Sequence, residues 1–161
     1  IAAIDEINHV RRIRIHTRLP VVIPQRLTAE LQNTLSNTRC DNAMVLHVNH
    51  PNELTSLHGE RLRELRNSGV TLLNQSVLLQ GVNDDIVILA ELSQKLFTMG
   101  VLPYYLHLPD KVEGTQHYFV SDKEATALYL GIREQLPGYL VPQLVREVPG
   151  DPYKRPHPVL A

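Results

Sequence analysis

Apolar and polar positions along the chain predict strands that alternate with helices. Residues 12–16 alternate with a period of two, which is typical of a strand with one covered face, and polar residues follow them. Three further strands are predicted at residues 43–48, 70–73 and 101–107. Strands that alternate with helices pair in parallel through right-handed crossovers, so the pattern indicates an α/β fold.

The helices are predicted from their start signals and from apolar residues at helical spacing. Thr28 is predicted to cap a short helix, and a longer helix is expected to begin at about Glu53. Asp84 is predicted to cap the third helix, and residues 121–124 have the pattern of a capping box for the fourth. Residues 145–161, rich in proline and polar residues, are expected to form an ordered loop rather than a helix.

About four strand–helix units fit into the 161 residues. A closed eight-stranded barrel needs roughly 200 or more residues, so we expect an incomplete barrel or an open α/β sheet. Such a sheet has an exposed edge strand, which a free-standing protein would have to cover. The chain begins with Ile1 rather than Met, which is compatible with a fragment of a longer protein.

Composition narrows the class of protein. The chain is 43% hydrophobic and 20% charged, as is ordinary for a globular domain, and its net charge of −1 gives no reason to expect a nucleic-acid or anionic-membrane partner. No apolar run approaches the roughly 20 residues that cross a bilayer, so a cytoplasmic protein is the default expectation. Because Cys40 is the one cysteine, an internal disulfide and a cysteine-bound metal cluster made from this chain alone are excluded.

Polar residues follow every predicted strand at its carboxyl end. They are His16 and Arg18, His47 and Asn49, Asn74 and Gln75, and Asp110. The carboxyl ends of parallel strands meet at one side of the sheet, which is where ligands bind in α/β folds. We therefore predict the binding site there. His107 and His117 could face the same opening, but nothing in the sequence decides this, whereas His58 has the pattern of a surface residue.

His47, His50 and Glu53 could form a metal-binding set. However, Pro51 interrupts any helix that would place the two imidazoles on one face. We therefore predict no metal ligands in this chain. A hydrogen bond to a ligand is favoured for His47, and a turn into the next helix is favoured for residues 50–53.

Three further segments each have two alternative interpretations, one functional and one structural. The amides of Asn74 and Gln75 could bind a ligand or satisfy nearby backbone groups, and the spacing favours neither. Asp110 and Glu147 could together bind an ammonium group, although Asp110 alone would more often be a solvated loop acid. Lys154 could form a Schiff base with an aldehyde cofactor, but by spacing alone an ordinary surface lysine is the more common case.

Several long segments, in a fixed order along the chain, resemble a known protein family more specifically than the short patterns above. Residues 12–26, 47–53, 74–84 and 103–105 resemble the lysine 2,3-aminomutase family of radical S-adenosylmethionine enzymes. Residues 105–114, 138–142 and 146–154 are similar to the bacterial branch that makes β-lysine for the modification of elongation factor P.

The resemblance implies a partial (β/α)6 TIM-like barrel of which this chain would be the C-terminal half. Residues 1–140 would form the later strand–helix units, and residues 141–161 would form the cofactor-lysine loop and tail. The implied activity converts L-α-lysine to β-lysine by a radical 1,2-amino shift. It requires pyridoxal 5′-phosphate, S-adenosyl-L-methionine and a [4Fe-4S] cluster.

The resemblance also implies roles for five residues. Lys154 would hold pyridoxal phosphate as a Schiff base, Asp110 and Glu147 would bind the ε-ammonium of the substrate L-lysine, and His47 and Gln75 would contact S-adenosylmethionine. The family's three-cysteine cluster motif is absent here, so the activity is assigned to an intact parent and this chain alone is predicted to be inactive. Elongation factor P would be an indirect partner, and whether the protein forms a homo-oligomer is left open.

Two other functions remain open. One is a pyridoxal phosphate or phosphate-ligand α/β barrel enzyme that works without radicals. The other is a non-catalytic binding module that keeps the lysine and the two acids. Cluster cysteines encoded upstream would support the aminomutase over both alternatives.

Overall fold

A computed structural model of the chain describes residues 1–110 and 114–159. These residues form one six-stranded sheet in the order β1-β2-β3-β4-β5-β6. The strands are β1 (Arg12–Thr17), β2 (Asp41–Leu46), β3 (Thr71–Val77), β4 (Leu102–His107), β5 (Gln143–Arg146) and β6 (Arg155–Pro156). Neighbouring strands from β1 to β5 pair in parallel, and β6 pairs antiparallel with β5.

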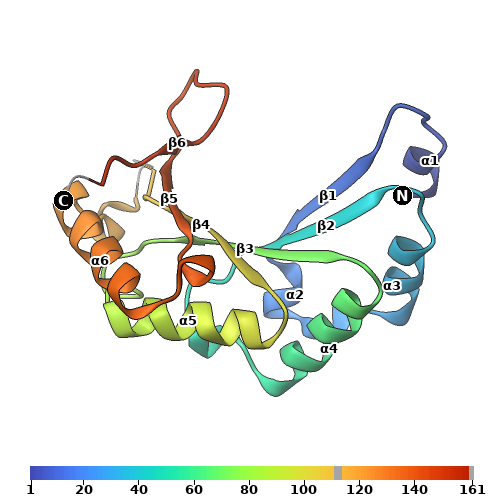
Figure 1. Ribbon diagram of the computed structural model, residues 1–161, viewed down its shortest axis with the longest axis horizontal. Coiled ribbons are helices and arrows are strands. Elements are labelled where there is room, and N and C mark those ends of the chain that lie inside the picture. Colours follow the sequence, from blue (N-terminus) through green and yellow to red (C-terminus); the bar gives the residue numbers. More distant parts are fainter. Residues whose placement is uncertain (111–113, 160–161) are drawn as a thin grey trace.

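The helices lie mainly on one face of this sheet (Figure 1). They are α1 (Ala2–Asp5), α2 (Leu19–Val22), α3 (Ala29–Ser36), α4 (Ser56–Asn67), α5 (Ile86–Thr98) and α6 (Asp122–Gln135). Four 3-10 turns, η1 (Pro24–Arg26), η2 (Pro51–Glu53), η3 (Gln116–Tyr118) and η4 (Gly138–Leu140), complete the described elements. Among the described residues, no helix has the length and apolar character needed to cross a membrane.

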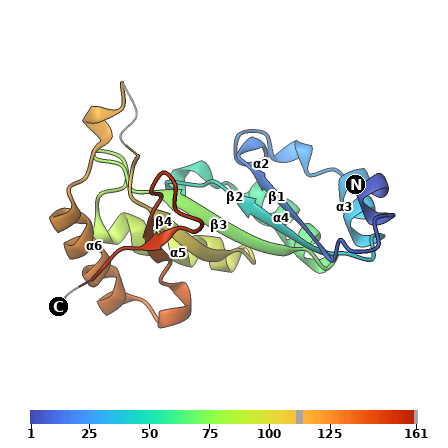
Figure 2. The same cartoon turned by 90° about the horizontal axis from the view of Figure 1, so that it is seen from above.

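The two ends of the molecule are easiest to follow from above. In Figure 2, α1 and α3 lie at one end of the sheet and α6 lies at the opposite end. The loop between β5 and β6 rises on the side of the sheet away from α4 and α5 (Figure 1). The sheet therefore has one helix-covered face and one open face, and the β5–β6 loop stands over the open one.

The main core fixes which strand residues face the helices. Ile15, Met44 and Leu72 are opposite one another in adjacent strands and pack in one cluster with Leu62 of α4 and Leu96 of α5. Because successive strand residues point to opposite faces, the intervening residues of these strands belong to the open face. The period of two predicted for β1 thus has its expected structural origin.

A second core holds α6 against the far end of the sheet. Leu106 of β4 and Leu144 of β5 are opposite one another and pack with Ala125 and Ile132 of α6. Ser121 and Glu124 form the predicted capping box at the start of this helix. The packing of α6 places β5 beside β4, so the loop that follows β5 lies over the open face.

The predicted α/β class with parallel strands is confirmed, and the sheet is compatible with part of an α/β barrel. The count of about four strand–helix units is confirmed, but a fifth parallel strand, β5, was not predicted. In the described part of the segment 145–161, which ends at residue 159, there is no helix, as predicted, but this part includes the end of β5 and all of β6. These strands have four and two residues, too few to show a period of two.

Helix starts needed two corrections. Thr28 accepts a hydrogen bond from the Leu31 amide, as predicted for a cap. However, residues 51–53 form a 3-10 turn, and α4 begins only at Ser56. The cap of α5 is Asp85 rather than Asp84, because the Asp85 carboxylate is the one that accepts from the first amides of the helix.

Candidate functional site

The carboxyl ends of β2 to β5 meet at a cavity of about 320 Å³. Its lining includes Arg18, His47, Gln75, His107, Asp110 and Glu147. Four of these, His47, Gln75, Asp110 and Glu147, are predicted site residues. We call this cavity the mouth.

Strand register explains why these side chains meet. Gln75 is opposite Tyr105, and Val77 is opposite His107 in the next strand. His107 is in turn opposite Val145, two residues before Glu147. Since alternate residues share a face, Gln75 and His107 lie on neighbouring strands of the open face, and Glu147 directly follows the next strand, β5.

Lys154 reaches the same place from the β5–β6 loop. Its ammonium forms an ion pair with Glu147 and lies 5.8 Å from the centre of the Tyr105 ring. The Lys154 side chain is only 27% exposed. A hydrogen bond from Lys154 lowers the pKa of Glu147, so the Glu147 carboxylate is charged near neutral pH. The structure therefore brings together Lys154 and the predicted acid Glu147.

His47 and Gln75 are in contact across β2 and β3. Gln75 Nε2 lies 3.3 Å from His47 Nε2. An amide nitrogen only donates, so the contact requires the lone pair of the imidazole on His47 Nε2. Burial, assisted by the charges of Arg18 and Lys154, lowers the pKa of His47 and favours this neutral ring. Gln75 Oε1 is buried and has no hydrogen-bond partner among the described residues, so it is available to a ligand that donates.

Of the two residues, Asn74 satisfies nearby backbone groups and Gln75 does not. Asn74 Oδ1 accepts from the Val48 amide at 2.9 Å, and Asn74 Nδ2 donates to the Val48 carbonyl at 3.1 Å. Asn74 is therefore a structural residue of the helix-covered face. Gln75 alone points to the mouth.

The segment 50–53 is a turn, as favoured over a metal site. Glu53 accepts hydrogen bonds from the amides of Asn49 and His50 and also pairs with Arg18. His50 Nδ1 accepts from the Asn52 amide. Within residues 1–110 and 114–159, no three His, Cys, Asp or Glu side chains are grouped so that they could hold a metal ion. Cys40 is buried at the start of β2, at the opposite end of the sheet from the mouth.

His107 is the site residue that sequence reasoning left undecided. It ends β4, is 8% exposed, and its Nε2 is buried without a hydrogen-bond partner in the described part of the chain. Burial lowers the pKa of His107 to about 4, and the charge of Lys154 acts in the same direction. Its place at the carboxyl end of a strand was the available sequence signal, but spacing could not show the unpaired nitrogen.

The other histidines have different surroundings. His16 lies with its ring 6.0 Å from that of His47, edge to face, beside the mouth. His117 is exposed and stacks near Tyr118, away from the mouth lining. The surface assignment of His58 was wrong: its Nε2 lies 3.0 Å from the Val21 carbonyl, and the residue is 5% exposed.

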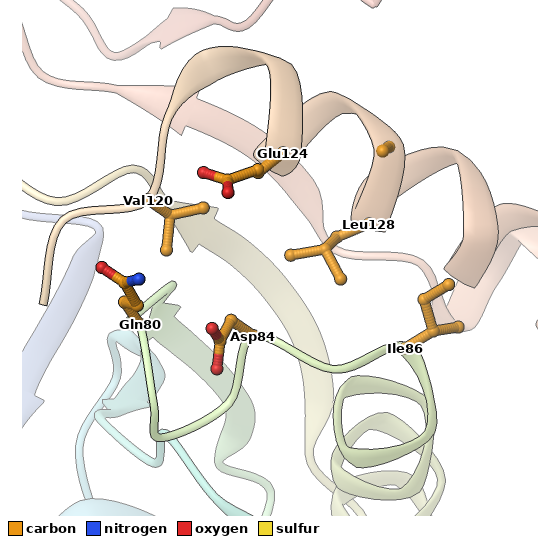
Figure 3. Close-up of a pocket in the computed structure, with 7 residues that line it drawn as sticks. Gln80, Asp84, Ile86, Val120, Glu124 and Leu128 are labelled. Carbon is orange, nitrogen blue, oxygen red and sulfur yellow. The ribbon is translucent and has the colours of Figure 1, made fainter.

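A second cavity, of about 290 Å³, lies between the β3–α5 loop and α6 (Figure 3). In Figure 3, Gln80 and Asp84 face Val120 and Glu124 across the gap. Both acids are already engaged locally, Asp84 by the Gly81 amide and Glu124 by Ser121. This cavity contains none of the predicted site residues, so the mouth remains the candidate site.

Comparison with known proteins identifies the relatives of this chain. No family model matches it. It is 54% identical over 94% of its length to the L-lysine 2,3-aminomutase of Haemophilus influenzae and 47% identical over 95% to that of Escherichia coli. The chain belongs to the lysine 2,3-aminomutase family. The aminomutase of Clostridium subterminale is 40% identical over 97% of the chain.

The chain spans less than half the length of these aminomutases. It covers 45% of the Haemophilus and Escherichia proteins and 37% of the Clostridium protein. The expected resemblance to the lysine 2,3-aminomutase family is confirmed. Because the chain covers only part of these relatives, their activity supports a proposal about this chain.

Proposed function

We propose that this chain is part of an L-lysine 2,3-aminomutase, an isomerase that converts L-lysine to β-lysine by moving the amino group from C2 to C3. One observation carries the proposal. In a member of this family, Asp110 and Glu147 line one mouth, and a half-buried lysine amine, that of Lys154, pairs with Glu147. The same mouth has buried hydrogen-bonding atoms without a partner among the described residues.

Lys154 is the proposed attachment point for pyridoxal phosphate. Its amine suits a covalent bond to an aldehyde once it has lost a proton, and Glu147 is the neighbouring carboxylate that can take part in that proton transfer. The ring of Tyr105 bounds the same space. When bound, the cofactor supplies an electron-delocalising system that stabilises an unpaired electron beside the migrating nitrogen. The protein's own part is to position the reacting groups and to exclude water.

Asp110 and Glu147 are the proposed binding groups for the ε-ammonium of lysine. Two carboxylates that face one opening repel one another unless a cation lies between them. In the structure Lys154 is the cation that faces Glu147. Once the Lys154 amine is used by the cofactor, a substrate ammonium would restore the charge balance.

His47 and Gln75 are proposed to contact S-adenosylmethionine. The contact with His47 orients the Gln75 amide so that Oε1 is left as an acceptor at the mouth. N–H groups of an adenine or of an amino-acid moiety would match this acceptor. The ligands of a [4Fe-4S] cluster do not come from the described residues, and we propose that a cysteine motif outside this chain supplies them.

We also propose that the β-lysine product serves the modification of elongation factor P. The support is the similarity of residues 105–114, 138–142 and 146–154 to the bacterial branch with that role. The last of these segments includes both Glu147 and Lys154. The proposed division of the chain follows the same lines, with strand–helix units in residues 1–140 and the cofactor loop in residues 141–161.

The test uses the full-length protein that contains this chain, with L-lysine, S-adenosylmethionine and a reductant under anaerobic conditions. We expect β-lysine to form, and borohydride treatment should fix pyridoxal phosphate to the peptide that contains Lys154. Lys154→Ala should abolish both signals, and Lys123→Ala, on the exposed side of α6, is the matched control. Cofactor fixed to a different lysine would remove Lys154 from the proposal. A product formed without S-adenosylmethionine would favour the non-radical enzyme, and lysine binding without turnover would favour the binding module.

A further inference from the structure

His107 differs from the other polar residues of the mouth in how deeply it lies. It is 8% exposed, whereas Asp110 and Glu147 are exposed residues at the rim. Its ring is edge to face with Tyr105 at 5.7 Å, which fixes the plane of the imidazole. A buried polar atom without a partner is uncommon in folded proteins, and His107 Nε2 is such an atom among the described residues.

The surroundings of His107 determine what its Nε2 can do. The charged and titratable groups that act on the ring are Lys154, Glu147, Asp110 and His47. Burial and the ammonium of Lys154 keep the ring uncharged at neutral pH, in spite of the two carboxylates. An uncharged imidazole has one N–H and one nitrogen lone pair, so it can accept one hydrogen bond. A substrate ammonium that replaces the Lys154 ammonium in the mouth would favour the uncharged ring in the same way.

A primary ammonium has three N–H donors and needs three acceptors when it leaves water. Asp110 and Glu147 offer two carboxylates at the rim of the mouth. We propose that His107 provides the third acceptor through Nε2, so that the mouth recognises an alkylammonium group by hydrogen bonds as well as by charge. His107 is then a specificity-determining residue for the terminal amine of the substrate.

This inference rests on the proposed function, because it assigns to the ε-ammonium of lysine a third contact beside the two acids. The third contact adds selectivity among cations, which charge alone would not provide. Two carboxylates attract any organic cation, whereas a lone pair at the floor of the site favours one that has an N–H to donate.

The test compares the binding of L-lysine and L-norleucine to the full-length protein loaded with pyridoxal phosphate, by titration calorimetry without S-adenosylmethionine. The two ligands have the same main-chain groups and six-carbon skeleton, and only lysine has the ε-ammonium. His107→Leu should weaken L-lysine binding by roughly 10- to 100-fold, the usual effect of losing a hydrogen bond to a charged group. Norleucine binding should change by less than about 3-fold. His107→Gln, which keeps an acceptor near the position of Nε2, should retain most of the lysine affinity.

A second measurement keeps the test decisive if His107→Leu does not fold. In wild-type protein with ¹⁵N-labelled histidine, L-lysine should shift the Nε2 resonance of His107 in the direction of an accepted hydrogen bond, and norleucine should not. Equal effects of both ligands, or equal weakening of both by His107→Leu, would overturn the assignment to the ammonium. If Asp110→Asn also leaves the preference for lysine intact, the proposed lysine site itself fails. If it removes the preference while His107→Leu does not, only the role of His107 fails.

Discussion

Two neighbouring amides in β3 show how differently the two faces of the sheet use polar groups. Asn74, 1% exposed, faces the helices and is fully engaged by the Val48 amide and carbonyl and by Ser76. Gln75 faces the mouth, where its amide nitrogen contacts His47 and its Oε1 has no hydrogen-bond partner in the described part of the chain. One residue along the strand separates a structural amide from one with unused hydrogen-bonding capacity.

The same contrast holds beyond β3. Asn83, completely buried, accepts from the Leu79 amide and donates to the carbonyls of Asn49 and Val77, so it closes the loop after the strand. At the mouth, His107 Nε2 has no such partner among the described residues. Buried polar groups that satisfy the backbone stabilise a fold, whereas unpaired ones facing a cavity indicate a ligand. The predictions below test this difference.

The largest effect is expected for Asn74→Leu. The substitution leaves the buried amide and carbonyl of Val48 without the Asn74 side chain, and should lower the free energy of unfolding by about 2–4 kcal/mol. Urea denaturation followed by circular dichroism measures this change.

Gln75→Leu is the matched control from the next position. It removes an amide that no backbone group depends on, so the free energy of unfolding should change by less than about 1 kcal/mol. A similar loss of stability for both variants would contradict the distinction between the two faces.

The second effect is a pH dependence of stability that originates at His107. The pKa of His107 falls from 6.5 to about 4 on folding, so the unfolded chain binds a proton that the native state does not. The stability from this group is therefore complete above about pH 6.5 and is lost as the pH falls toward 4. The lowered pKa values of His16 and His47 act in the same direction.

Urea unfolding at pH 7.0, 5.5 and 4.5 tests this expectation. Wild-type protein should lose stability steadily over that range, and His107→Gln should lose less, because glutamine does not titrate. The pKa of Glu147 is lowered on folding, so this group stabilises the native state above its unfolded-state pKa. Its contribution is lost mainly below pH 4.5, outside the range of these measurements. Equal pH dependence in both proteins would show that His107 is not protonated more readily in the unfolded chain.

Much of the fold could be predicted because its local signals agree with its packing. The alternation in residues 12–16 reflects a strand between helices and an open face, and Ser121 and Glu124 do form the predicted cap. The features that the sequence did not predict are short or depend on contacts between residues far apart in the chain. β5 has four residues beside Pro142, and the burial of His58 depends on a carbonyl 37 positions away in the chain.

The site could be predicted in part for the same reason. Parallel strands bring their carboxyl ends together, so His47, Gln75 and Asp110 could be placed at one opening before the structure was known. Lys154 is 44 positions after Asp110 in a loop without periodicity, and only the family resemblance singled it out. The selection of His107 required its burial and its unpaired nitrogen, which depend on the packing of β4 between β3 and β5.

The smallest effect is expected at the start of α5, outside the mouth. Asp85 accepts hydrogen bonds from the amides of Val87 and Ile88, so Asp85→Ala should lower the free energy of unfolding by about 1 kcal/mol. Asp84→Ala removes the hydrogen bond from the Gly81 amide and should cost about 0.5 kcal/mol. Urea denaturation should rank the two variants in this order. Calorimetry should find the lysine affinity of both unchanged, since neither side chain lines the mouth. A reduced lysine affinity in Asp85→Ala would mean that the capping of α5 and the shape of the mouth are coupled, and the separation of structural from ligand-binding polar groups would then be incomplete.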